Sequence, residues 1–179
     1  GGRPSQMKIP GGEFAIDSNG FFELTEQPKD IVVLGAGYIA AELSGVLQGM
    51  GTQVHWAFRH SRPLRTFDTM LADNLVEIYR DNGMKLYDHH VAKEIKRTED
   101  GRYTVHFENG NTLSGEYVLF AGGRIPNTDQ LGLENTSVTL NEKGFVIVDK
   151  FQNTTSEGVY AVGDVIGKID LTPVAIAAG

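Results

Sequence analysis

The sequence predicts an α/β protein with a Rossmann-like NAD(P)-binding domain, in which a parallel sheet forms the centre and an antiparallel β-meander forms a crossover. Two observations lead to this fold class. A short apolar run at 31–34 ends in Gly-x-Gly-x-x-Ala at 35–40, and an Ala- and Leu-rich helix follows, which is the strand–turn–helix order of a parallel α/β unit. Further on, an Asp-Gly pair at 100–101 and an Asn-Gly pair at 109–110 separate three short stretches and are typical of tight hairpins.

The first part of the chain, residues 1–28, is rich in glycine and proline, so we expect loops and short extended pieces there. Residues 30–35 predict a buried strand, because 31–34 are apolar and three of those four residues are β-branched. Residues 38–50 predict a helix, after which Gly51 is suited to the residue that follows the last turn. Four apolar side chains at spacings of three and four are expected on the buried face of this helix: Ile39, Leu43, Val46 and Leu47.

A second strand–helix unit follows directly. Residues 53–58 predict a strand, and a helix is expected from about Asp68, a suitable N-cap residue, to Asn82, which precedes a glycine. Residues 84–87 predict a third strand. The apolar stripe of this second helix is expected at Leu71, Leu75, Ile78 and Tyr79.

The three short stretches after this unit are 91–98, 102–107 and 112–120. Apolar and polar residues alternate in the middle stretch, which is typical of a half-buried antiparallel strand. Residues 118–121 then predict a fully buried strand. Beyond residue 127 the sequence predicts short strands at 144–149 and 158–161 among polar loops, and a helix that starts near Pro173.

Composition limits the classes of function. A net charge of −7 over 179 residues disfavours nucleic acid as a partner, and no apolar run approaches the roughly 18 residues of a membrane span. The chain has no cysteine and no histidine pair at ligand spacing, so we expect no disulfide and no metal site. The N-terminus has no apolar leader, so we expect a cytoplasmic protein, and the missing initiator Met suggests a larger reading frame.

The glycine motif predicts a dinucleotide site. Gly35 permits the tight turn, and Gly37 lets the backbone approach a pyrophosphate that sits on the helix N-terminus. Ala40 keeps the helix close to the strand. The alternative is a βα turn that uses glycine for geometry alone.

A basic segment follows the second strand, where an NAD site would carry a carboxylate for the ribose 2′-hydroxyl. Guanidinium groups there would instead bind a 2′-phosphate, so the segment predicts NADPH as the ligand. Arg59 and Arg65 are the first candidates, His60 is a secondary contact, and Arg62 is expected to be solvated. The alternative is an exposed basic loop without a ligand.

Two further features have equally simple alternatives. Tyr38 and Glu42 are one helical turn apart and share a face, but spacing alone favours a surface aromatic and an ordinary helix carboxylate. Asp164 follows an apolar stretch and a glycine, and it is either a ligand for a ribose or ribitol hydroxyl or an N-cap residue.

These motifs occur together in one family. Over essentially its whole length, the chain resembles the glutathione reductases, which are FAD-dependent pyridine nucleotide–disulfide oxidoreductases. The segments that carry the resemblance are 1–5, 35–40, 59–68, 123–127, 151–154, 160–164 and 171–175.

The resemblance implies that residues 1–126 are an NADPH-binding domain and that residues 127–179 are the central, incomplete segment of an FAD-binding domain. It implies that Tyr38 is the gate residue over the flavin face and that Glu42 is the helix carboxylate near the nicotinamide. It matches the 2′-phosphate positions to Arg59, His60 and Arg65, further NADPH contacts to Ala36, Ile39, Gly123 and Arg124, and FAD contacts to Gly163, Asp164 and Thr172.

In this family the full enzyme is a homodimer that passes hydride from NADPH to FAD and then electrons, through a cysteine pair, to glutathione disulfide. The chain has neither a second glycine fingerprint for FAD nor the cysteine pair, so we expect NADPH binding without turnover and no stable FAD. Two alternatives stay open. The chain is the same module of a sister enzyme such as trypanothione or mycothione reductase, or it is a stand-alone dinucleotide-binding module without catalysis.

Overall fold

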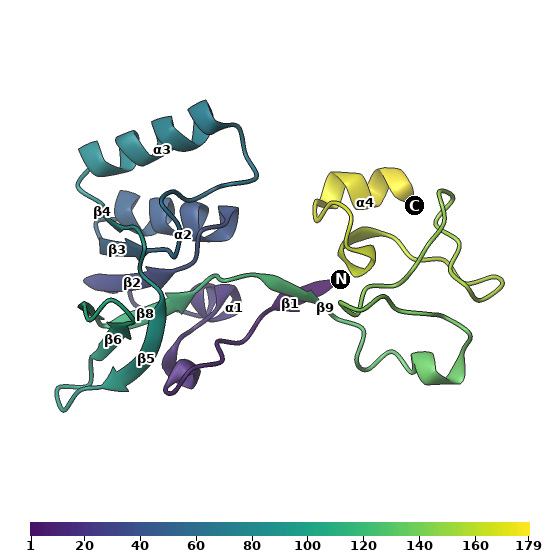
Figure 1. Cartoon of the computed structure of the whole chain (residues 1–179), viewed down its shortest axis with the longest axis horizontal. Helices are drawn as coiled ribbons and strands as arrows, with labels where there is room; N and C mark the ends of the chain where they lie inside the picture. The colour runs from purple at the N-terminus through teal and green to yellow at the C-terminus, as the bar shows by residue number, and fades with distance from the viewer. The chain divides into compact units, whose positions relative to one another are not determined.

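The computed structural model describes residues 1–179, and the chain divides into two compact units. The larger unit is Pro4–Gly123, and the smaller unit combines Gly1–Arg3 with Arg124–Gly179. Figure 1 shows the elements of both units, and each unit is described on its own below. No helix has both the length and the apolar character that crossing a membrane requires.

The larger unit is built on a parallel sheet, as the sequence predicts. Its strands occur in the order β4-β3-β2-β8, and every neighbouring pair is parallel. The bounds of these strands are Asp30–Leu34 for β2, Gln53–Ala57 for β3, Lys85–Tyr87 for β4 and Tyr117–Phe120 for β8. Because all strands point the same way, their carboxyl ends lie at one edge, which is where parallel sheets bind ligands.

Helices cover one face of this sheet (Figure 1). Ile31 and Val33 of β2 are fully buried on this face, together with Trp56 of β3. Their alternation with Val32 and Leu34, which face the other side, follows from the two-residue period of a strand. The helices are α1 (Ser18–Phe22), α2 (Tyr38–Gly49) and α3 (Thr69–Asp81).

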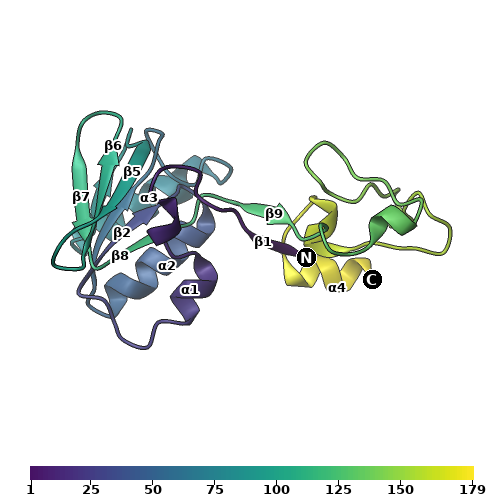
Figure 2. The same ribbon diagram turned by 90° about the horizontal axis from the view of Figure 1, so that it is seen from below.

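An antiparallel meander covers the other face, and Figure 2 shows its three strands side by side. These strands are β5 (Ala92–Arg97), β6 (Tyr103–Phe107) and β7 (Thr112–Gly115). Ile95, Val105 and Phe107 are buried against Val32 and Val118 of the parallel sheet. The predicted crossover is therefore confirmed, and it fills the second half of the core.

The single stretch predicted at 112–120 is wrong in one respect, because the chain changes sheets within it. β7 ends at Gly115 in the meander and β8 begins at Tyr117 in the parallel sheet. A Cβ atom on Gly115 would lie 2.9 Å from the Tyr117 carbonyl oxygen and 3.1 Å from the Val32 backbone nitrogen. This crossing brings two backbones together more closely than any side chain allows, so only glycine fits there.

The buried faces of the two long helices differ in part from the apolar stripes in the sequence. In α2, Leu43 and Leu47 are buried as predicted, but Val46 is 49% exposed and the buried set also includes the small residues Ala40, Ala41 and Ser44. In α3, Leu71 and Ile78 are more than half exposed, and the buried residues are Ala72 and Val76. Small residues among the buried positions let each helix lie close to the sheet, and larger apolar residues beside that contact, such as Val46 and Leu71, stay exposed.

Two short elements were missed in the N-terminal segment, which was expected to contain only loops and extended pieces. One is the 3-10 turn Gly12–Phe14, and the other is α1. The Asp17 carboxylate begins α1 because it accepts hydrogen bonds from the backbone N–H groups of Asn19 and Gly20, at 2.8 Å and 3.2 Å.

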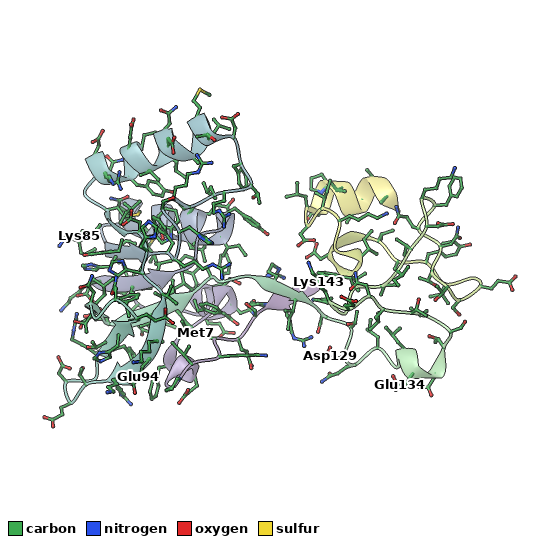
Figure 3. The ribbon with its side chains drawn as sticks, viewed as in Figure 1. Met7, Lys85, Glu94, Asp129, Glu134 and Lys143 are labelled. Atoms are coloured by element: carbon green, nitrogen blue, oxygen red, sulfur yellow. The ribbon has the colours of Figure 1, made fainter.

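The smaller unit has little regular structure. Strand β1 (Gly2–Pro4) pairs with β9 (Arg124–Pro126), and η2 (Leu133–Asn135), η3 (Gly163–Ile166) and α4 (Thr172–Ala178) complete its elements. Arg3 makes a salt bridge with Asp129, which Figure 3 labels.

The strands predicted at 144–149 and 158–161 are wrong. Only two isolated bridges form there, between Leu140 and Val146 and between Asn153 and Tyr160. The Asp149 carboxylate accepts hydrogen bonds from the backbone N–H groups of Phe151 and Asn153, which turns the chain before a strand can extend. Asp164 lies in η3 rather than at the end of a strand.

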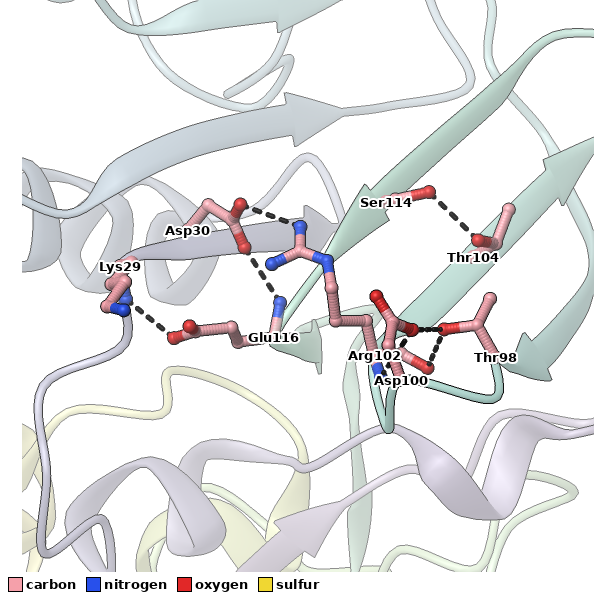
Figure 4. Close-up of polar contacts among 8 residues, drawn as sticks. All are labelled: Lys29, Asp30, Thr98, Asp100, Arg102, Thr104, Ser114 and Glu116. Atoms are coloured by element: carbon pink, nitrogen blue, oxygen red, sulfur yellow. Dashed lines mark hydrogen bonds and ion pairs between the residues drawn. The ribbon is translucent and has the colours of Figure 1, made fainter.

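A charged cluster joins the amino-terminal edge of the parallel sheet to the meander (Figure 4). The Arg102 guanidinium donates to the Asp30 carboxylate at 2.7 Å, and the other oxygen of Asp30 accepts the Glu116 backbone N–H at 2.8 Å. The Glu116 carboxylate in turn accepts the Lys29 backbone N–H at 2.8 Å. Partial burial would raise the pKa of Asp30, but the hydrogen bonds and the Arg102 charge outweigh it and lower that pKa.

We expect Asp30→Asn to reduce the free energy of unfolding at neutral pH by about 1.5–3 kcal/mol, the usual worth of hydrogen bonds to a charged group. Since the pKa of Asp30 is lowered on folding, its contribution is fully present above its unfolded pKa of about 3.9 and is lost as the pH falls through the folded value. Denaturant unfolding of the wild type and the variant, repeated from neutral to acidic pH, measures this difference. The two proteins should therefore converge in stability under acidic conditions.

The matched control is Glu94→Gln on β5, labelled in Figure 3. The Glu94 carboxylate contacts only Lys96, at 3.1 Å on the surface of the same strand. Exposed pairs of this kind contribute about 1 kcal/mol or less. Equal losses for the Asp30 and Glu94 variants would contradict a special role for the cluster.

Candidate functional site

The glycine turn after β2 is held by contacts to the two strands that flank β2 in the parallel sheet, β3 and β8. Gly35 has φ +145°, and a Cβ atom there would lie 2.3 Å from the carbonyl oxygen of Ala121, which follows β8. The Gly35 carbonyl oxygen accepts the indole N–H of Trp56 at 2.7 Å, and its N–H donates to the Ala57 carbonyl at 3.2 Å. The turn therefore has one backbone path, and glycine is the residue that can follow it.

Gly37 serves a different purpose in the same turn. It is the N-cap residue of α2, no side chain caps the helix there, and no atom lies within 4 Å of the place where its Cβ would be. The first N–H groups of α2 are therefore open to an anion, which the helix dipole also attracts. Ala40, the third position of the motif, is fully buried against the sheet.

A cavity of about 450 Å³ lies at this carboxyl edge of the sheet. The glycine turn forms one wall, and the basic segment after β3 forms another. Seven residues that the sequence singled out line this one cavity: Gly35, Ala36, Gly37, Tyr38, Arg59, His60 and Arg65. The volume is in the range of small-molecule and cofactor sites.

Backbone hydrogen bonds fix the basic segment beside the glycine turn. The Leu64 N–H donates to the Ala36 carbonyl at 2.7 Å, and Leu64 is buried with φ +53°, unusual for a side chain of its size. On the other side of the segment, the His90 N–H donates to the Phe58 carbonyl at 3.0 Å and the His89 N–H to the His60 carbonyl at 3.3 Å. The segment is thus held at both ends.

The two candidate arginines converge on one imidazole nitrogen. Arg59 Nε lies 3.1 Å from His60 Nε2, and Arg65 Nη1 lies 2.8 Å from the same atom. Desolvation and the charges of Arg65 and Arg59 lower the pKa of His60, with a smaller contribution from His89. Arg62 lies 3.9 Å from Asp73 of α3 instead, so it is the member of the segment with an acidic partner.

Three further predicted residues of the larger unit are not part of the cavity lining: Ile39, Glu42 and Gly123. Tyr38 is on the lining and is 38% exposed, whereas Glu42, one turn further along α2, is exposed and not part of that lining. Ile39 is half-buried against the helix-side core. The Gly123 carbonyl accepts the Ser5 N–H at 3.0 Å.

The remaining predicted residues belong to the smaller unit. Arg124 donates to the Gly2 carbonyl, Gly163 and Asp164 lie in η3, and Thr172 begins α4. None of them lines a cavity of the larger unit. The structure therefore describes one cofactor-sized site for the glycine and arginine motifs. The NADPH role of Arg124 and the FAD roles of Gly163, Asp164 and Thr172 stay predictions.

Several residues of the cavity were missed by sequence reasoning. They come from the N-terminal segment, from the start of β5 and the residue before it, and from the end of β8, and they include Met7, Val91, Ala92 and Phe120. No local motif marks them, because these separate segments meet at the cavity only through the packing of the larger unit. No three His, Asp or Glu side chains come together in a group that could hold a metal ion.

The whole chain, residues 1–179, matches the family described as pyridine nucleotide-disulphide oxidoreductase. It is 40% identical to glutathione reductase of Schizosaccharomyces pombe and 36% identical to glutathione reductase of Yarrowia lipolytica. In both comparisons all of this chain aligns, with 39% of the relative. Among solved structures, the HOCl-induced flavoprotein disulfide reductase RclA from Escherichia coli matches with a TM-score of 0.93 and 31% identity, over 99% of this chain and 41% of RclA.

We expect Gly35→Ala and Gly37→Ala to have opposite effects on stability, although both positions belong to one turn. Gly35→Ala should cost more than about 1 kcal/mol of unfolding free energy, because the new Cβ meets the Ala121 carbonyl and the φ angle is unfavourable. Gly37→Ala should leave stability unchanged or raise it slightly, because its Cβ enters open space at φ −90°. Denaturant unfolding of the two variants measures this, and equal stability would contradict the separate roles.

Proposed function

The chain belongs to the pyridine nucleotide–disulphide oxidoreductase family, and from that premise we propose that the cavity at the carboxyl edge of its parallel sheet binds NADPH. The observation that carries this proposal is the pair of guanidinium groups, of Arg59 and Arg65, that lie free of any carboxylate beside the glycine turn. A 2′-phosphate is the group that distinguishes NADPH from NADH, and arginines are suited to bind it.

The residues of the cavity fit the two anionic groups of this ligand. The pyrophosphate would lie on the open N–H groups at the start of α2, where the missing side chain of Gly37 leaves room for it. The 2′-phosphate would lie between Arg59 and Arg65. The Leu64–Ala36 hydrogen bond holds these two positions next to each other.

Tyr38 and Glu42 are the proposed residues of the nicotinamide end. NADPH supplies a hydride when bound, so the groups around its nicotinamide must position the ring and exclude water. Tyr38 is a partly exposed aromatic ring on the cavity lining, suited to cover the face where a flavin would approach. Glu42 presents an exposed carboxylate one turn further along the same helix.

The chain spans about 39% of the length of the curated relatives it matches, so the activity of a whole enzyme is a further proposal. We propose that the chain is the NADPH-binding portion, with residues 127–179 as part of an FAD domain, of a homodimeric cytoplasmic glutathione reductase. That enzyme would use NADPH to reduce glutathione disulfide. The identity to two glutathione reductases supports this substrate over those of trypanothione or mycothione reductases.

We expect the chain to bind NADPH more tightly than NADH. Replacing Arg59 or Arg65 with Gln should weaken NADPH by about 1.5–3 kcal/mol, or roughly 10- to 100-fold in the dissociation constant, because a charged partner of the phosphate is lost. Binding of NADH, which has no 2′-phosphate, should change little. Titration calorimetry of both dinucleotides with each variant measures the selectivity.

The matched control for these variants is Arg62→Gln. Arg62 belongs to the same basic segment but lies against Asp73, so the NADPH-to-NADH ratio should stay at the wild-type value. Equal affinity of the wild type for NADPH and NADH would contradict the proposed function. An equal loss in all three arginine variants would instead indicate a general effect of positive charge.

We expect the chain by itself not to reduce glutathione disulfide with NADPH. It contains no cysteine, so it has no dithiol to carry electrons to a disulfide. Loss of NADPH absorbance in a mixture of the chain, NADPH and glutathione disulfide should stay at the rate without protein. Turnover at an enzymatic rate would contradict the proposal that this chain only binds NADPH and that the disulfide is reduced elsewhere in the enzyme. NADPH binding without turnover agrees with it.

A further inference from the structure

We propose that His60, in its neutral form, holds Arg59 and Arg65 together before the ligand arrives, and that it takes up a proton when a 2′-phosphate replaces it as their partner. This inference rests on the proposed binding of NADPH. His60 is thus a positioning residue of the phosphate site, and it couples dinucleotide selectivity to pH.

The geometry requires a particular form of His60 when the site is empty of phosphate. Both guanidinium groups donate toward Nε2, at 3.1 Å from Arg59 and 2.8 Å from Arg65. Nε2 can accept only when it carries no proton, so the proton of the neutral ring must be on Nδ1. An imidazolium would place an N–H against two cations and would separate the arginines.

The hydrogen bonds to His60 satisfy the two guanidinium groups only in part, so a better acceptor can readily replace the imidazole. An imidazole nitrogen offers one lone pair, and here two N–H donors share it. A phosphate offers three acceptor oxygens and a charge of about −1.5 to −2, so it can accept from both guanidinium groups at once. His60 therefore serves as a stand-in acceptor that keeps two like charges close together.

The charged and titratable groups around His60 all lower its pKa. Arg59 and Arg65 belong to its own segment, and His89 faces it from the turn before β5. Neither arginine forms an ion pair, and Arg62 of the same segment lies against Asp73 of α3. Without an anion these neighbours favour neutral His60, whereas a bound phosphate offsets the two arginine charges and places an anion beside the ring, which favours the imidazolium.

The backbone keeps this arrangement in place during the exchange. The His60 carbonyl accepts the His89 N–H, and the next turn of the segment is tied to the glycine turn through Leu64. Side chains alone therefore have to move when phosphate replaces the imidazole. The pKa of His60 rises in the complex, so the complex binds more protons than the free protein, and affinity for NADPH rises as the pH falls.

Titration calorimetry with NADPH in two buffers of different ionisation enthalpy tests the proposal, because it counts the protons taken up. Between about pH 8 and pH 6.5 we expect uptake of a fraction of one proton and a gain in NADPH affinity of about three- to tenfold. NADH should show neither. His60→Gln keeps an acceptor oxygen for the arginines but has no titratable ring, so it should bind NADPH more weakly at every pH and lose the extra uptake.

The phosphate itself titrates near pH 6, and both arginines bind it in the wild type and in the Gln variant, so the difference in proton uptake between the two proteins measures what the titration of His60 adds. Nitrogen NMR of the wild-type imidazole provides a second readout that needs no variant. It should report the Nδ1–H tautomer in the free protein and an imidazolium with NADPH near neutral pH. Identical proton uptake in both proteins, or a ring that stays neutral in the complex, would overturn the proposal. If NADPH selectivity persists in that case, the proposed function stands, and if NADPH and NADH bind equally, the proposed function itself fails.

Discussion

The close passage of two backbones at Gly35 is the constraint on which the larger unit depends. The turn after β2 lies against the Ala121 carbonyl and under the Trp56 indole, so it is tied to the ends of both neighbouring strands. Because these contacts use backbone and a buried indole, they need no side chain from Gly37 or from the first residues of α2. Gly37 and the start of α2 are exposed as a result, and an anion can reach them.

Charged side chains are paired at one edge of the parallel sheet and unpaired at the other. At the amino-terminal edge, the Asp30 carboxylate is matched by the Arg102 guanidinium and by backbone N–H groups. At the carboxyl edge, Arg59 and Arg65 have no acid to pair with, although the chain carries a net charge of −7. The first arrangement satisfies its ions within the protein, and the second leaves cations for a partner from solution.

Local motifs predicted the fold class and much of the site because short-range rules decide them. Strand β2, the glycine turn and the start of α2 follow one another within a dozen residues, and the basic segment follows β3 directly. Long-range packing decided what the sequence did not reveal. Val46 and Leu71 lie outward because smaller neighbours let the helices approach the sheet, and Val91 reaches the cavity only because the meander folds back. The strands expected around Val146 did not form, since the Asp149 carboxylate turns the chain.

The hydrogen bond from the Leu64 N–H to the Ala36 carbonyl has a consequence for recognition. It joins the loop that carries the arginines to the turn that precedes α2, and both lie on rigid strand ends. The proposed positions for the pyrophosphate and the 2′-phosphate are therefore held at one separation. With NADPH bound as proposed, the spacing of the phosphates would contribute to selectivity as well as their charge, so a nucleotide phosphorylated on another ribose oxygen would reach only one of the two positions.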